Sequence, residues 1–218
     1  MTDESLIREV DDEVRQDEYK KIWDRYGTAI MGLAFLVVAS VGGFKAYEYY
    51  QLKQSEDASV VYLDAIAKAK DGKLDDAMSA LAAIKHPGFV QLARVQEAAV
   101  LAAKGDAAKA IAGFEAVAAD SKTDPALADL AMIRAGYLLV DTATPDELLT
   151  RLGKYDTATS IWRHQAREIF GLSAYRIKDY VMANRYMSAI FDDVETPQAL
   201  RQRAQVMIQL IAPNLPKS

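Results

Sequence analysis

The side chains that could do chemistry in this chain are few and lie far apart. His86 and His164 have no second ligand at the spacing of a metal site. There is no cysteine, which excludes disulfides, thiolate zinc sites and cysteine nucleophiles. The short patterns of serine hydrolases, phosphate-binding loops, dinucleotide-binding folds and zinc proteases are also missing. We therefore expect a protein that is not an enzyme and needs no cofactor or metal.

Two carboxylate pairs come closest to an acid–base site. Asp75 and Asp76 fall in the first turn of a predicted helix, where acids favour the helix dipole. Asp192 and Asp193 fall in a predicted connecting turn, where we expect a solvated loop. The net charge of −5 argues against nucleic-acid binding. No small-molecule substrate is indicated.

Aromatic and arginine side chains gather in the last third of the chain. Such residues often anchor protein interfaces. The candidates for a protein-binding surface are Trp162, Arg163, Arg167, Phe170, Tyr175, Arg176, Tyr180 and Arg185. The alternative interpretation is that the rings fill the core between repeats while the arginines are solvated.

A repeated unit predicts the elements that carry these residues. Gly72 and Gly105 are each followed five residues later by an alanine, and the two units are 33 residues apart. Lys178 holds the glycine's place before Ala183. A turn glycine followed by a small helical residue is typical of helical hairpins, because the small side chain lets the two helices approach closely.

Proline caps and alanine-rich stretches set the predicted boundaries. Helices are expected at 56–70, 73–84, 88–104, 107–119, 125–140, 145–152, 159–176, 179–192 and 197–211. They form about four hairpins and a closing helix. Solenoids need a polar outer face at such an end. The residues expected to supply it are Arg201, Gln202, Arg203, Gln205 and Gln209.

The run Tyr26–Phe44 holds 19 residues and no charge. As a helix it would measure about 28 Å, close to the hydrocarbon thickness of a bilayer. We interpret it as a single membrane span, with a cleaved signal peptide and a buried core helix as the alternatives. No glycine or proline follows Phe44 until Gly72, so the helix can continue outward into the first repeat.

The flanks of the run indicate an orientation. Four basic residues precede it closely and two follow it, which favours a cytoplasmic N-terminus. Trp23 and Tyr26 lie at one end and Tyr47–Tyr50 at the other, as in the aromatic belts of membrane proteins. Gly32, Ala39 and Gly43 share one helix face that could pack against a second membrane helix, although glycine is common in such helices anyway.

A family resemblance draws these features together. Ala108–Phe114 (AKAIAGF) matches the A-x-x-x-F part of the tetratricopeptide repeat. The entry Trp23–Gly27, the pattern Lys178-Asp179-Tyr180 and the sequence 196–200 resemble the YfgM-type tetratricopeptide repeat-like family of ancillary SecYEG translocon subunits. Lys178 departs from the glycine expected there. The resemblance implies one span, a periplasmic domain, and partners among translocon subunits, periplasmic chaperones and exported clients.

Together these observations predict an all-α protein: one transmembrane helix, then a right-handed tetratricopeptide-like α-solenoid. The expected division is 1–25 cytoplasmic acidic tail, 26–44 transmembrane helix, 45–55 juxtamembrane linker, 56–212 repeat domain and 213–218 C-terminal tail. The expected location is the bacterial inner membrane. The expected function is protein binding beside the Sec translocon, with a scaffold for an envelope or cell-division complex as the alternative.

Overall fold

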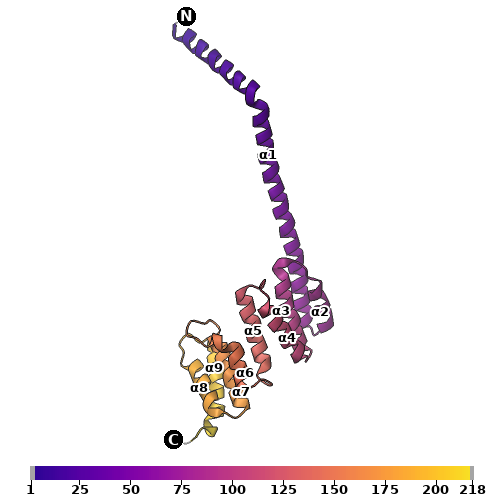
Figure 1. The fold of residues 1–218 in the computed structure, drawn as a ribbon, viewed down its shortest axis with the longest axis vertical. Helices are drawn as coiled ribbons and strands as arrows, with labels where there is room; N and C mark the ends of the chain where they lie inside the picture. The colour runs from indigo at the N-terminus through magenta and orange to yellow at the C-terminus, as the bar shows by residue number, and fades with distance from the viewer. Residues whose placement is uncertain (1–2, 217–218) are drawn as a thin grey trace. The chain divides into compact units, whose positions relative to one another are not determined.

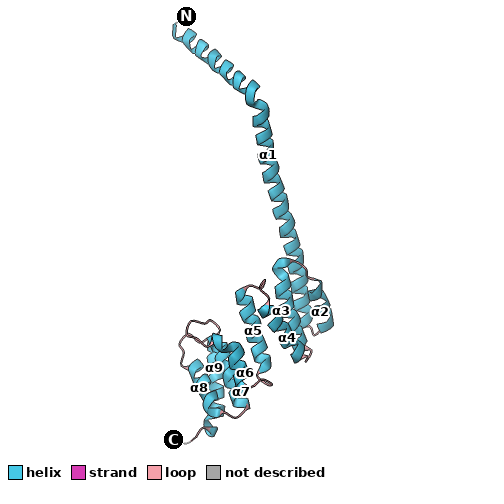
Figure 2. Ribbon diagram, viewed as in Figure 1, coloured by secondary structure: helices cyan, strands magenta, loops and turns pink. Residues whose placement is uncertain are grey.

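The computed structural model describes residues 3–216, with the side chains of residues 20, 21 and 23–216. Residues 1–2 and 217–218, at the ends of the two predicted tails, lie outside the described part. The described residues form helices joined by turns, without a strand (Figures 1 and 2). The elements are α1 (Asp3–Lys70), α2 (Leu74–Ala83), α3 (Pro87–Ala103), α4 (Ala107–Ala119), α5 (Pro125–Leu139), α6 (Pro145–Leu152), η1 (Gly153–Tyr155), α7 (Arg163–Arg176), α8 (Tyr180–Phe191), α9 (Gln198–Ile211) and η2 (Ala212–Asn214).

The helix boundaries agree with the predicted ones to within one residue at most ends. The predicted helix 56–70 is the last part of α1, which continues through the apolar run, as the absence of Gly and Pro indicates. The prediction that a helix starts at residue 159 is wrong, because α7 starts at Arg163. The Ser160 side chain accepts the Trp162 N–H at 3.2 Å, a local hydrogen bond that competes with helix formation.

Three turns between helices have the same backbone geometry. Gly72, Gly105 and Lys178 are the positive-φ residues of the described chain, at 77°, 85° and 65°. After Gly105, the Asp106 N–H reaches back to the carbonyl of Leu101, and the Gly105 N–H donates to Ala102. The turns at Gly72 and Lys178 repeat this pair of bonds, which defines a Schellman ending. Lys178 therefore forms the repeat's turn without the expected glycine.

The strain at Lys178 gives a first prediction. Replacing Lys178 by glycine is expected to raise the free energy of unfolding by about 1 kcal/mol. The reason is that the left-handed backbone conformation is less favourable by roughly this amount for a residue with a Cβ than for glycine. The side chain is exposed, so little packing is lost. Denaturant titration would measure the gain. Gly105→Ala is the matched control, and we expect it to lower the free energy of unfolding by about the same amount. A lower free energy of unfolding in Lys178→Gly would contradict the strain argument.

The core consists of clusters between neighbouring helices. Ala65 of α1 packs with Ala77 and Leu81 of α2, so the end of α1 is the first helix of the first hairpin. A Cβ added at Gly113 of α4 would lie 3.1 Å from the Cβ of Ala98 in α3, which shows how closely the second hairpin's helices approach. The small residues that the repeat pattern predicts are thus where helices meet.

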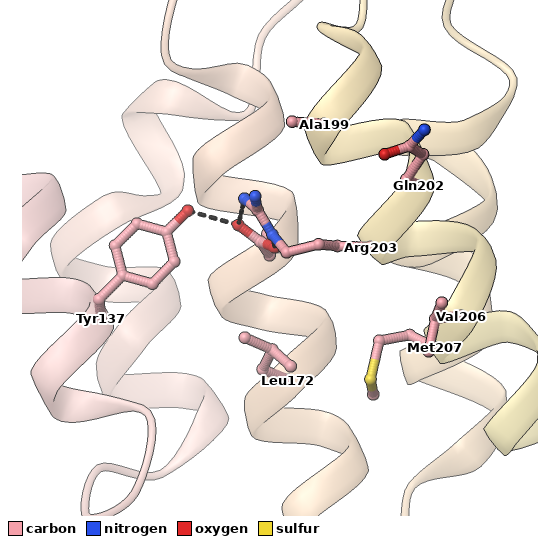
Figure 3. A pocket seen from close by; sticks show the side chains of 8 residues that line it. Tyr137, Leu172, Ala199, Gln202, Arg203, Val206 and Met207 are labelled. Carbon is pink, nitrogen blue, oxygen red and sulfur yellow. Dashed lines mark hydrogen bonds and ion pairs between the residues drawn. The ribbon is translucent and has the colours of Figure 1, made fainter.

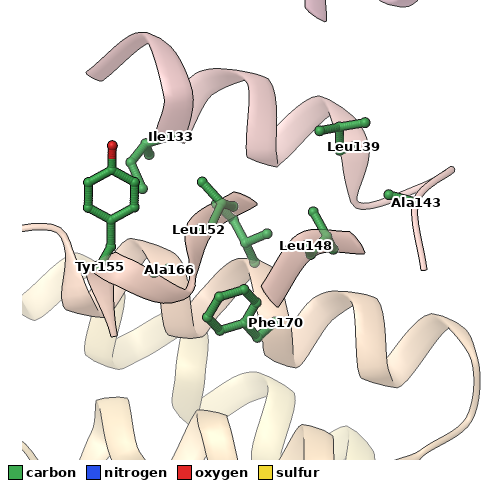
Figure 4. Packing of buried hydrophobic residues seen from close by; sticks show 9 residues of the cluster. Ile133, Leu139, Ala143, Leu148, Leu152, Tyr155, Ala166 and Phe170 are labelled. Atoms are coloured by element: carbon green, nitrogen blue, oxygen red, sulfur yellow. The ribbon is translucent and has the colours of Figure 1, made fainter. Parts of the chain in front are cut away.

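The largest cluster lies among α5, α6 and α7 (Figure 4). Leu148 and Leu152 of the short α6 point into it beside Ile169 and Phe170 of α7. A capping box at Thr144, in which Glu147 bonds back to the Thr144 N–H, fixes the start of α6. This packing joins the third hairpin to the fourth.

The chain divides into two compact units, one up to Glu56 and one from Asp57 on. In the first unit the apolar run is uncovered: Phe35 is 73% exposed and Val38 70%. Among the described residues, α1 is the helix long and apolar enough to cross a membrane. Within the first unit, the described residues leave these side chains exposed, which favours a membrane span over a buried core helix.

Candidate protein-binding groove

The first helices of successive hairpins share one face of the second unit. Helix α3 contacts α5, α5 contacts α7, and α7 contacts the closing helix α9. This stacking follows from the repeat, because each hairpin packs on the next in the same way. Side chains that point outward from these helices lie next to one another although they are 30 or more residues apart in the chain.

An open groove of about 630 Å³ lies on this face between α5, α7 and α9 (Figure 3). We call it the C-terminal groove. Its lining residues are Tyr137, Glu168, Leu172, Ala199, Gln202, Arg203, Val206 and Met207. Leu172, Val206 and Met207 give one part of it an apolar lining (Figure 3).

The polar part of the C-terminal groove is a three-residue network. The Tyr137 hydroxyl donates to Glu168 Oε2 at 2.5 Å, and Arg203 Nε donates to Glu168 Oε1 at 2.7 Å (Figure 3). The Glu168 side chain is only 7% exposed. A buried carboxylate is tolerated when a guanidinium and hydrogen bonds compensate its lost hydration. The network therefore links α5, α7 and α9 at the rim of the groove.

The network is suited to holding helices in place. Burial and the hydrogen bond to Glu168 raise the pKa of the Tyr137 hydroxyl, which stays a neutral donor. Arg203 is held charged, since its pKa is raised by the bond to Glu168. The described residues include no group of three or more His, Asp or Glu side chains that could hold a metal. What the groove offers a partner is apolar area beside a compensated ion pair.

Comparison with protein families identifies the architecture. Residues 20–185 match the tetratricopeptide repeat-like domain family, which is more than half of the chain. The chain belongs to this family. None of the curated proteins and none of the solved structures compared with it matches. The matched range begins before the apolar run, so the run and the tetratricopeptide-like domain belong to one family unit.

Within the tetratricopeptide-like domain, the predicted arginines are engaged inside the chain. Arg163 Nε donates to Asp193 Oδ2 at 2.9 Å, and Arg163 also pairs with Glu195 at 2.5 Å. Arg167 Nε donates to Asp156 at 2.7 Å. Both arginines therefore link the start of α7 to the loops that carry Asp156, Asp193 and Glu195. The alternative that these two arginines are merely solvated is wrong.

The loop after α8 is solvent-exposed, as expected, at Asp192, Val194 and Glu195. Asp193 is half-buried instead: it accepts bonds from Arg163 and from the Glu195 N–H, and these lower the pKa of Asp193 to about 2. Arg201 donates to the Asp193 carbonyl from α9. The loop is therefore an ordered junction between α7, α8 and α9.

Of the predicted aromatic residues, Phe170 is buried, and Trp162, Tyr175 and Tyr180 are half-buried. Phe170 is 2% exposed and its ring lies 5.3 Å from that of Tyr186. Tyr175 and Tyr180 stack edge to face across the α7–α8 turn, 5.8 Å apart. Trp162 packs against the cluster shown in Figure 4. Phe170 is therefore a core residue, and the other three pack at the edges of the core clusters.

The last two predicted arginines lie on the surface of the domain. Arg176 donates to the carbonyl of Ala143 at 2.5 Å, and Arg185 stacks over the ring of Tyr186. The structure places none of the eight candidates in the C-terminal groove. It gathers them around α7 and α8, where their contacts are within the chain.

The groove residues themselves were missed or misread in the sequence. The predicted polar outer face of α9 is only partly polar, since Val206 is 55% exposed and Leu210 51%. Arg203, expected on that face, turns to Glu168. The available signal was the spacing of Ala199, Val206 and Leu210, which puts a second apolar stripe on α9 beside the one that Leu200, Ala204 and Ile211 bury.

The candidate membrane-packing face is open in the structure. A Cβ at Gly32 or Gly43 would meet no atom within 4 Å. Ala39 is exposed on the same helix. Packing of this face against another helix stays a prediction.

Proposed function

We propose that this protein is a membrane-anchored protein-interaction module, an ancillary subunit of the Sec translocon that links it to periplasmic chaperones and newly exported proteins. In this proposal the apolar run of α1 spans the bacterial inner membrane once. The N-terminus is cytoplasmic, and the tetratricopeptide-like domain is a right-handed solenoid in the periplasm.

The C-terminal groove is the observation that supports binding most directly. An open groove with an apolar lining, on the face shared by α5, α7 and α9, is the kind of surface on which repeat domains bind partners. Apolar grooves at a domain surface are common sites of contact with protein partners.

The anchor supports the proposed location. The apolar run is uncovered by the described chain and continues as helix into the first hairpin. Such a connection would hold the repeat domain close to the membrane surface. The excess of Lys and Arg before the run favours the orientation that exposes the domain to the periplasm.

Site-specific photocrosslinking in cells tests the proposal. A photoreactive amino acid at Val206 in the groove should give crosslinks to translocon subunits, chaperones or exported proteins, identified by mass spectrometry. The same amino acid at Val181 on α8 is the matched control, because both valines are exposed on helices (55% and 60%) and Val181 does not line the groove.

We expect partner crosslinks at Val206 and few at Val181. Crosslinks only to cell-division or envelope-assembly proteins would replace the Sec assignment with the scaffold function. Equal yields at both positions, or none, would contradict a role for the groove in binding.

A further inference from the structure

We propose that the C-terminal groove binds the apolar face of an amphipathic α-helix whose polar edge carries carboxylates. The inference rests on the proposed function, because it names the class of partner segment that the same groove takes. It follows from the shape of the groove's walls, the apolar stripe of α9 and the charges at the rim.

The walls of the groove favour a helix over an extended peptide. All three walls are helices, and the described residues contain no strand, so there is no sheet edge to pair with a peptide backbone. An extended segment lying on Leu172, Val206 and Met207 would lose water from backbone groups that find no partner there, at a cost of roughly 1–3 kcal/mol for each group. A helix satisfies these groups internally.

The apolar stripe matches the repeat of a partner helix. Ala199, Val206 and Leu210 lie on one face of α9 at intervals of seven and four residues, with Arg203 between the first two. Ala199 and Val206 line the groove, and Leu210 is exposed one turn beyond it. The stripe extends over about 16 Å at ~1.5 Å per residue, which is about three helical turns. Leu172 of α7 faces Met207 across the groove (Figure 3), so side chains of a partner could insert between ridges from two helices.

The lining of the groove carries one cation, Arg203, and one anion, Glu168. Helix α9 contributes Arg203 and no carboxylate to this lining. The single carboxylate in the lining, Glu168, is already bound by Arg203, whose side chain remains 56% exposed. A guanidinium has five N–H donors, so Arg203 can serve a second acceptor.

Helix α5 adds a second positive group near the rim. Arg134 is exposed three residues before Tyr137, on the same side of the helix, and forms no ion pair with any described residue. Carboxylates along one edge of a bound helix would meet these two arginines. A basic helix would be repelled.

A peptide-binding assay on the full chain in nanodiscs tests this inference. The probe is a fluorescent peptide of about 16 residues with leucines at helical spacing and glutamates beside them. A second peptide of identical composition has alternating leucines, as in a strand. Anionic phosphatidylglycerol discs repel both acidic peptides, and empty discs give the background. We expect saturable binding of the helical peptide and about tenfold or more weaker binding of the alternating one.

Two protein variants locate the site. Val206→Glu should weaken binding of the helical peptide about tenfold or more, whereas Val181→Glu should leave it unchanged. Glutamine in place of the peptide's glutamates should weaken binding several-fold. Equal binding of the two peptides, no saturable binding, or no effect of Val206→Glu would overturn the helix assignment. Equal binding of the glutamine peptide would overturn the carboxylate preference.

Failure here is distinguishable from failure of the proposed function. Crosslinking at Val206 in cells reports any partner in the groove, whatever its conformation. Crosslinks to cellular partners without binding of the helical peptide would retain the function and reject this partner class.

Discussion

Replacing Phe170 by alanine is expected to lower the free energy of unfolding by about 3–5 kcal/mol. The side chain is 2% exposed, and it packs with Leu148, Leu152 and Ile169 in the cluster that joins the third and fourth hairpins (Figure 4). Removing the ring would leave a cavity that these neighbours fill only in part. Denaturant titration of the full chain in detergent, followed by circular dichroism, would measure the loss.

Phe191→Ala is the matched control, because Phe191 ends α8 and is 39% exposed. We expect it to cost about 1 kcal/mol, in keeping with a surface position. The comparison decides between the two interpretations of the aromatic cluster. A Phe170→Ala variant as stable as the Phe191→Ala variant would return Phe170 to the binding candidates.

Acidification is expected to destabilise the junction of α7, α8 and α9. His164 is 4% exposed, and its Nδ1 lies 3.1 Å from the Thr196 hydroxyl, which itself donates to the Ile190 carbonyl. A hydroxyl has one hydrogen, so Nδ1 of His164 is the donor to Thr196 in this arrangement. Burial, with Arg163 next in effect, lowers the pKa of His164 below its usual 6.5 despite the nearby Asp193.

The direction of the pH effect follows from this lowered pKa. Below about pH 6.5 the unfolded chain takes up a proton at His164 that the folded chain resists, so stability present above that pH is lost as the pH falls. One proton corresponds to at most about 1.4 kcal/mol per pH unit. Thermal unfolding at several pH values between about 7.5 and about 5 would measure this loss of stability.

His164→Gln should remove this part of the pH dependence, because an amide side chain does not titrate in this range. His86→Gln is the control, because His86 lies at the surface start of α3, where its Nδ1 accepts the Gly88 N–H. Identical pH profiles for the wild type and His164→Gln would show that the buried imidazole is not the group responsible. The lowered pKa of Asp193 adds a separate loss of stability below about pH 4, as that carboxylate protonates.

Local sequence signals were enough to predict the helices. Asp124 and Thr144 each precede a proline at the first helical position, and their side chains do cap α5 and α6. The turns at Gly72 and Gly105 were marked by the residue that tolerates positive φ. Lys178 shows the limit of that signal, because the surrounding packing imposes the same turn on a residue that disfavours it.

The roles of polar residues could not be predicted in this way. Arg163 finds Asp193 30 residues later in the chain, and Glu168 finds Arg203 35 residues later. A pairing at that distance depends on how one hairpin stacks on the next. In the sequence alone, Arg203 was an ordinary residue of a polar helix face.

The sequence by itself determined the elements and their order: one long apolar helix, then alanine-rich hairpins punctuated by glycine and proline. These features depend on backbone propensities and on side chains three or four residues apart. Only the tertiary structure decided which aromatic residues are core and which side chains form a groove. Tyr137, Glu168 and Arg203 meet because three separate helices stack at one register, and no local pattern encodes that register.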